Sequence, residues 1–294
     1  MAEQTLILGA ENHLVATLTP ANGGRTVPPR WVAVLSNAGV IPRIGPHRMN
    51  VRLARRFADM GIPSIRFDLS GLGDSLRSSS TLPIEQQWVA DTRAAMDTAQ
   101  AQFGCNRFFM VGFCSGAEVA HFAALEDRRL RAAVLWDWYS HTTLQSRLRA
   151  ALYKLRRAGP QKVVHKLLAR VWPAAHRSNA AVSETPESLA QVVQQVPSRE
   201  EYTGRIQALV DDGVELLFAY SGGEPERFNH RGQFRGMFGG YAFVDKVAFT
   251  YLEISDHLVT RREAQRSFTD MVVQWLEQRV LVAPPPAPPA SPPR

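Results

Sequence analysis

Short apolar runs alternate with longer amphipathic stretches along most of this chain. The short runs are typical of buried strands, whereas apolar positions that recur every three or four residues are typical of helices. Strands and helices that alternate in this way favour a largely parallel sheet covered by helices. The pattern predicts strands at residues 14–18, 31–35, 64–67, 107–111, 132–136, 214–220 and 247–254, and helices at residues 49–60, 83–103, 115–125, 228–238 and 261–280.

The alternation is interrupted between residues 139 and 212. Apolar positions at helical spacing mark two amphipathic segments there, at residues 144–155 and 164–171. An insertion between parallel strands usually covers the edge of the sheet at which ligands bind. We therefore expect a core in two parts (residues 1–138 and 213–282), a helical cap at residues 139–212, and a proline-rich tail without regular structure at residues 283–294.

The strongest chemical signal is Gly112-Phe113-Cys114-Ser115-Gly116, which stands between a predicted strand and a predicted helix. A tight strand-to-helix turn needs small residues two positions before and two positions after its centre, and it lifts the central side chain above the sheet. The motif therefore predicts a nucleophile elbow with Cys114 as the nucleophile, whose thiolate the N-terminus of the following helix would favour. The alternative is a buried structural cysteine between two packing glycines.

Small residues also follow the predicted strand at residues 31–35, where they would let the backbone approach a reacting carbonyl group. The backbone N–H of Ser115 and that of Ala38 or Gly39 are the candidate oxyanion-hole donors. His47 lies further along this loop and is a candidate substrate contact. The alternatives are a plain tight turn and, for His47, a structural hydrogen bond.

A base and an acid should follow the nucleophile along the chain, with the acid first and the histidine last. His257 comes directly after the last predicted strand and is the candidate base. Glu224, in the turn after the strand at residues 214–220, is the candidate acid that orients the imidazole. Glu226 and Asp137 are the alternatives for that role.

Two further runs match a known pattern, RIGPHR at residues 43–48 and DLSGLGDS at residues 68–75. With the elbow, they make the chain resemble the serine-aminopeptidase-like α/β hydrolases, in particular the exosortase-A-system-associated hydrolases and their acyl-transfer relatives, in which a Cys elbow also occurs. The resemblance implies an α/β-hydrolase fold with a mostly parallel central sheet flanked by helices. Glu224 stands where an aspartate is more usual in these proteins.

These residues predict acyl transfer or hydrolysis through an acyl-Cys114 intermediate. A thioester donor is favoured over an oxygen ester, because exchange of one thioester for another is nearly balanced in free energy. We expect no metal or other cofactor, since no Cys/His cluster has ligand spacing. The other hypotheses are a carboxylesterase or lipase-like hydrolase that acts at membranes, and a non-catalytic binding protein of the same fold.

The formal charge of +7 is concentrated in the predicted cap, where residues 141–180 hold nine Lys or Arg and no Asp or Glu. The rest of the chain has a slight negative excess, so the basicity does not indicate a nucleic-acid-binding fold. Arg156 and Arg157 are candidate substrate-binding residues, on a docking surface for an acidic acyl carrier protein or for the phosphates of coenzyme A. The alternative is a solvated basic face.

The sequence also bears on location. No stretch approaches the ~18 apolar residues that cross a membrane, and the N-terminus shows no signal peptide. Cys105 and Cys114 are the only two cysteines, which makes a disulfide framework implausible. We therefore expect a cytoplasmic protein.

Overall fold

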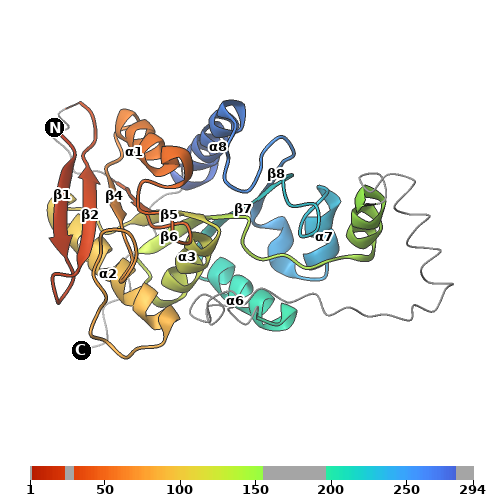
Figure 1. The fold of residues 1–294 in the computed structure, drawn as a ribbon, viewed down its shortest axis with the longest axis horizontal. Coiled ribbons are helices and arrows are strands. Elements are labelled where there is room, and N and C mark those ends of the chain that lie inside the picture. The colour runs from red at the N-terminus through yellow and green to blue at the C-terminus, as the bar shows by residue number, and fades with distance from the viewer. Residues whose placement is uncertain (1, 24–29, 155–196, 283–294) are drawn as a thin grey trace, which may run out of the picture.

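The computed structural model describes residues 2–23, 30–154 and 197–282. Eight strands form one sheet in the order β1-β2-β4-β3-β5-β6-β7-β8 (Figure 1). Strands β3 to β8 run parallel to one another, whereas β2 is antiparallel to both β1 and β4. The strands are β1 (Gln4–Leu8), β2 (Leu14–Thr19), β3 (Val32–Leu35), β4 (Ser64–Phe67), β5 (Phe108–Phe113), β6 (Leu130–Trp136), β7 (Glu215–Ser221) and β8 (Ala248–Leu252).

Helices cover both faces of this sheet (Figure 1). Helices α1 (Met49–Asp59) and α8 (Arg262–Trp275) pack on one face, and α2 (Ile84–Phe103), α3 (Ser115–Glu126) and α6 (Arg199–Asp211) pack on the other. Side chains alternate along β5 as the pleat requires, so that Phe108 and Met110 join the second group while Phe109 and Val111 join the first. The remaining elements are a helix at residues 144–154, α7 (Gly232–Phe238) and the short turns η1 (Pro46–Arg48), η2 (Ala242–Asp245) and η3 (Leu276–Val280).

The observed sheet and its helical layers are the α/β-hydrolase fold expected from the sequence. Two elements were missed. Strand β1 lies at the edge of the sheet and has one buried residue, so its sequence lacks a clear apolar pattern. Helix α6 lies inside the interval expected to form the cap, but it buries Tyr202 and Ile206 in the core beside α3.

The cap expected at residues 139–212 is described in part. Residues 144–154 are helical, as the leucine spacing predicts, and the side chains of Leu144, Leu148 and Leu152 are more than half exposed. Arg156, Arg157, the second amphipathic segment and the proline-rich tail lie outside the described residues. In the part of the chain that the structure describes, no helix is long and apolar enough to cross a membrane.

Candidate active site

Cys114 stands at the junction of β5 and α3, with φ 52° and ψ −119°. A non-glycine residue with this backbone geometry is strained, and such strain is typical of a nucleophile elbow. The flanking glycines make the turn possible. A Cβ atom on Gly112 would overlap the backbone of Gly116, and one on Gly116 would lie 2.5 Å from the carbonyl oxygen of Asn37. The elbow predicted from the sequence is therefore present, and the thiol of Cys114 is partly exposed at its tip.

His257 follows β8 and faces this thiol. Its ring Nδ1 lies 3.1 Å from Oδ2 of Asp137, and Cys114 lies close enough to raise the pKa of the imidazole. The loop is fixed from the sheet side, because the indole N–H of Trp136 donates to the backbone carbonyl of His257 at 2.9 Å. Cys114, His257 and Asp137 thus lie together at the ends of β5, β8 and β6.

The imidazole is held in its charged form. The hydrogen bond that His257 donates to Asp137 is the main cause that raises the pKa of His257 to about 10, and the proximity of Cys114 adds to it, while burial opposes both. A histidine with this pKa is an imidazolium at neutral pH.

Asp137 is the carboxylate that makes the hydrogen bond expected from Glu224. It comes directly after β6, is 6% exposed, and has a positive φ of 50° that turns its side chain toward His257. Its Oδ1 accepts the backbone N–H of Ser221 at 2.7 Å, which leaves Oδ2 for the imidazole. Cys114, this carboxylate and His257 follow one another along the chain in the expected order, but the carboxylate follows β6, the strand before the one that the sequence suggested.

Glu224 is nevertheless near the site. Its Oε1 lies 3.8 Å from Nδ1 of His257, which is too long for a hydrogen bond, and its Oε2 pairs with Arg227 at 3.0 Å. The turn that carries Glu224 can come this close because a Cβ on Gly223 would lie 2.5 Å from Cα of Asp256. Glu226, the other alternative, pairs with Lys154 at 2.9 Å instead.

The loop after β3 lies against the elbow, as expected for an oxyanion loop. The N–H of Ala38 donates to the carbonyl of Ile41 at 3.2 Å, whereas the N–H of Gly39 donates to the hydroxyl of Ser115 at 2.7 Å. The structure thus brings Ala38, Gly39 and Ser115 together beside Cys114. The backbone N–H groups of Ala38 and Gly39 thus already have acceptors within the protein, and the sequence does not predict this.

A buried network fixes the shape of this loop. Asp68 is fully buried, and its Oδ1 accepts from the side chain of Asn37 at 3.1 Å and from the backbone N–H of Arg43 at 2.6 Å. The guanidinium of Arg43 donates to the other oxygen of Asp68, and Oδ1 of Asn37 in turn accepts the N–H of Leu69 at 2.6 Å. The two runs that carried the family resemblance therefore meet here, in a structural role.

The other polar candidates are placed differently. His47 is exposed in the short turn η1, with a positive φ of 46°. Cys105 is buried, which raises the pKa of its thiol and fits an inert cysteine. His121 is also buried, among Phe122, Trp138 and Tyr202, and burial lowers its pKa to about 3, so it is a neutral packing residue.

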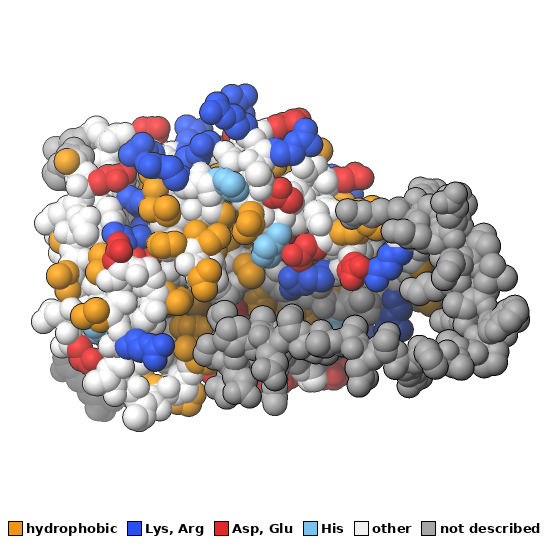
Figure 2. Space-filling model, viewed as in Figure 1, with side chains coloured by type: hydrophobic (Ala, Val, Ile, Leu, Met, Phe, Trp, Pro, Cys, Tyr) orange, Lys and Arg blue, Asp and Glu red, His pale blue; other side chains and the backbone are white. Residues whose placement is uncertain are grey.

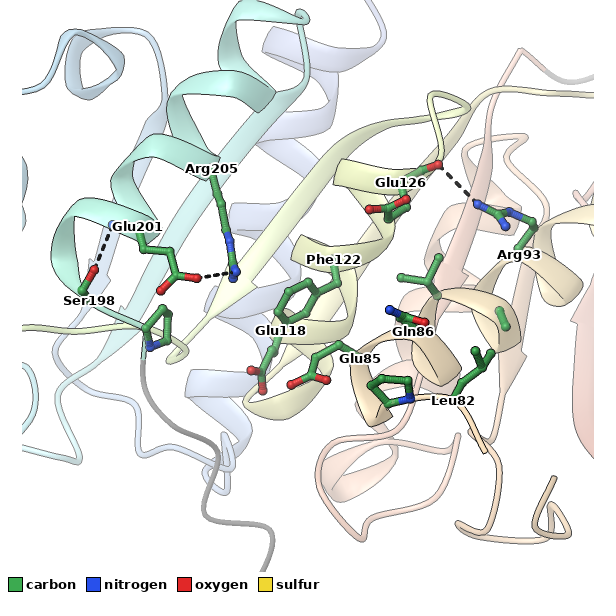
Figure 3. Close-up of a pocket in the computed structure, with 14 residues that line it drawn as sticks. Leu82, Glu85, Gln86, Arg93, Glu118, Phe122, Glu126, Ser198, Glu201 and Arg205 are labelled. Atoms are coloured by element: carbon green, nitrogen blue, oxygen red, sulfur yellow. Dashed lines mark hydrogen bonds and ion pairs between the residues drawn. The ribbon is translucent and has the colours of Figure 1, made fainter. Parts of the chain in front are cut away.

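Two further features of the surface are an apolar region beside the site and a cavity away from it. Apolar side chains next to its key residues are exposed, with Val40 75% and Leu258 42% accessible, and Figure 2 shows apolar side chains across the middle of this face with Lys and Arg gathered over α1 and α8. A cavity of about 940 Å³ lies elsewhere, between α2, α3 and α6, and is lined by Glu85, Glu118, Phe122 and Arg205 among others (Figure 3).

Comparisons with known proteins agree with this fold. The chain is similar to an α/β serine hydrolase without a lid from Xanthomonas campestris (13% identity, TM-score 0.54, 96% of each chain covered). It is also similar to an α/β serine hydrolase homologue from Coxiella burnetii (12% identity, TM-score 0.56, 94% of this chain and 98% of that chain covered). A third similar structure is an esterase from Pyrococcus furiosus (12% identity, TM-score 0.57, 94% of this chain and 89% of that chain covered). At these identities the likeness shows the fold alone. No curated protein matches the chain.

The family assignment comes from the sequence of the chain itself. The model of the serine aminopeptidase family, S33, matches residues 46–211, which is more than half of the chain and includes the elbow. The fold and the elbow geometry are those of an α/β hydrolase. This chain is therefore a hydrolase of the α/β-hydrolase superfamily and belongs to the serine aminopeptidase S33 family.

Proposed function

We propose that this chain transfers or hydrolyses acyl groups through an acyl-Cys114 intermediate, with His257 as the acid–base residue and Asp137 as the carboxylate that orients it. One observation carries the proposal: a strained elbow presents Cys114 to an imidazole whose pKa is raised to about 10. A cysteine kept for packing alone would need neither the positive φ nor a charged partner. The solved structures that resemble the chain are described as serine hydrolases, so the thiol is the feature to test.

The first half-reaction forms the acyl-enzyme. The Cys114 thiolate attacks the carbonyl carbon of the substrate, and the carbonyl oxygen becomes an oxyanion next to the N-terminus of α3. When this tetrahedral species collapses, the bond to the leaving thiol or alcohol breaks and His257 gives that group its proton. Asp137 then holds a neutral imidazole in the orientation needed for the second half.

The second half-reaction consumes the acyl-enzyme. His257 removes the proton of water or of an acceptor alcohol, amine or thiol, the acceptor attacks the thioester carbonyl, and the Cys114 thiolate leaves. Thioester donors suit this nucleophile because the bond broken and the bond formed are of one kind. An oxygen ester would have to be converted into the more reactive thioester.

The surroundings of the site support an apolar acyl group. Val40 follows Gly39 and Leu258 follows His257 in the chain, and both side chains are exposed. In this proposal the acyl donor is carried by an acidic carrier protein or by coenzyme A, and Arg156 and Arg157 contribute to its binding.

A lipid ester at a membrane surface is the second candidate for the substrate. The helical residues 144–154 expose Leu144, Leu148 and Leu152 along one stripe, and the same segment carries Arg147 and Arg149. An exposed apolar stripe beside cations is typical of helices that lie on anionic membranes. A lipase-like enzyme would be activated by vesicles that contain anionic lipid, whereas an enzyme for carrier-bound donors would not.

Intact-mass analysis after incubation with acyl thioesters and matched oxygen esters tests the proposal. The wild-type protein should gain one acyl mass that maps to Cys114, and Cys114→Ala should gain none and lose all turnover. Cys114→Ser is the matched variant for the donor, and it should shift the preference from thioesters toward oxygen esters. Full turnover by Cys114→Ala would disprove the proposal. Release of free acid alone, whichever acceptor is offered, would make the enzyme a plain hydrolase.

A further inference from the structure

The oxyanion site of this chain has an unusual supply of hydrogen-bond donors. A tetrahedral intermediate needs two donors aimed at its oxygen, and in this fold one comes from the residue after the nucleophile and the other from the loop after β3. Here the Ala38 amide donates to Ile41 and the Gly39 amide donates to the hydroxyl of Ser115. The loop therefore presents neither of these amides to a substrate in this state.

Ser115 itself carries two donors. It is the first residue of α3, where backbone N–H groups have no acceptor within the helix, and within the described residues its N–H makes no hydrogen bond. Its hydroxyl accepts from Gly39 at 2.7 Å, and a hydroxyl that accepts still has its own proton to donate. Ser115 is partly exposed, like the adjacent Cys114, so both groups can be reached by a bound substrate.

We propose that the hydroxyl of Ser115 is the second oxyanion donor, in place of an amide of the β3 loop. Gly39 N–H donates to the Ser115 oxygen, and the Ser115 O–H donates to the oxyanion that forms on the substrate carbonyl. A hydroxyl that accepts one hydrogen bond is polarised to donate another more strongly. Ser115 thus becomes a catalytic residue through its side chain as well as its backbone. This inference rests on the acyl-Cys114 chemistry proposed above.

The Ser115 hydroxyl could instead block the Gly39 amide, and this alternative predicts a different effect of removing the hydroxyl. If Ser115 merely occupies the Gly39 amide, removing the hydroxyl would free that amide for the substrate. Acylation of Ser115→Ala would then be as fast as that of the wild type, or faster. If the hydroxyl donates, acylation must slow down.

Two reactions of the Cys114 thiol, acylation and alkylation, distinguish the loss of an oxyanion donor from general damage to the site. Acylation of Cys114 by a neutral thioester builds an oxyanion, whereas alkylation by iodoacetamide displaces iodide at a saturated carbon and builds none. Single-turnover acylation and alkylation are therefore measured side by side, by intact mass, for the wild type, Ser115→Ala and Ser115→Thr. The Thr variant keeps the hydroxyl and is the matched control.

We expect Ser115→Ala to slow acylation about 100-fold, the usual effect of removing one oxyanion donor, with no change in alkylation. Ser115→Thr should retain most of the acylation rate. Acylation of Ser115→Ala at or above the wild-type rate would overturn the inference, and so would an equal loss in acylation and alkylation. If the wild type is alkylated at Cys114 but is never acylated there, the proposed function itself fails. This result differs from the two outcomes that would overturn only the inference on Ser115.

Discussion

Two carboxylates face the imidazole of His257, and their settings differ. Asp137 is buried after β6, receives the backbone N–H of Ser221, and lies 3.1 Å from Nδ1. Glu224 lies in the turn after β7, is 34% exposed, pairs with Arg227, and lies 3.8 Å from the same atom. The interaction of a carboxylate with a cation is strong where water is excluded and geometry is fixed, and weak at an exposed ion pair. Burial and a second anchoring hydrogen bond thus distinguish Asp137, the proposed orienting acid, from Glu224.

The largest effect should come from Asp137→Asn. The amide keeps the shape of the side chain but removes the negative charge and offers a donor to Nδ1, which favours the wrong tautomer of His257. We expect kcat to fall on the order of 100-fold or more with an acyl thioester, less than in a serine enzyme because a thiolate needs less help from a base. A steady-state assay measures this, and circular dichroism provides the control for folding. A loss smaller than that of Glu224→Gln would reverse the assignment.

The titration of His257 gives a second, direct measure of the comparison. The ring resonances of His257 in NMR should titrate with a pKa of about 10 in the wild type and at a clearly lower pH in Asp137→Asn. Since the folded pKa lies above the usual value of 6.5, the stabilisation by this pair is complete below pH 6.5 and is lost as the pH rises through 10. The difference in melting temperature between wild type and Asp137→Asn should therefore shrink from pH 6 to pH 10. A constant difference would show that the His257–Asp137 pair has no such role.

The smallest effect is expected for Glu224→Gln. A partly exposed carboxylate that already pairs with a guanidinium contributes little to a charge 3.8 Å away, about 1 kcal/mol or less, so kcat should change by no more than a few fold. Arg227→Met is the matched control, since it removes the partner of Glu224 and leaves its carboxylate free to turn toward His257. If Glu224 does share the role of Asp137, the double variant with Asp137→Asn would lose more than the product of the two single effects.

The sequence predicted the parts of the site that local rules determine. Gly112 and Gly116 around Cys114 define the elbow because both turn geometry and close packing exclude a Cβ there, and the position of His257 follows from its place after the last strand. The choice between Asp137 and Glu224 could not be made in this way. It depends on which of two loops at neighbouring strand ends reaches Nδ1, and this distance is set by the backbone of Asp137 and the N–H of Ser221 in three dimensions.

The same distinction applies to the fold. The buried strands, such as β5 and β6, carry continuous apolar runs that a pattern can find. Strand β1 has little to bury, so its apolar pattern is weak. Helix α6 does place Tyr202, Ile206 and Leu209 at helical spacing, but they stand in a mostly polar sequence inside the interval assigned to the cap, so no core helix is expected there. The hydrogen bond between Gly39 and Ser115 joins residues 76 positions apart and has no sequence signature.

The buried carboxylate of Asp68 has a consequence for anyone who wishes to redesign this enzyme. It anchors Asn37 and Arg43 and thereby the loop that lies over the elbow, although it contacts none of the reacting groups. Loss of one partner of a buried charge pair costs about 3–5 kcal/mol, a large part of the stability of a typical domain. A library that varies the loop between β3 and α1 to change substrate preference should therefore hold Asn37, Arg43 and Asp68 fixed as one unit and place its diversity at the exposed Val40 and Ile44.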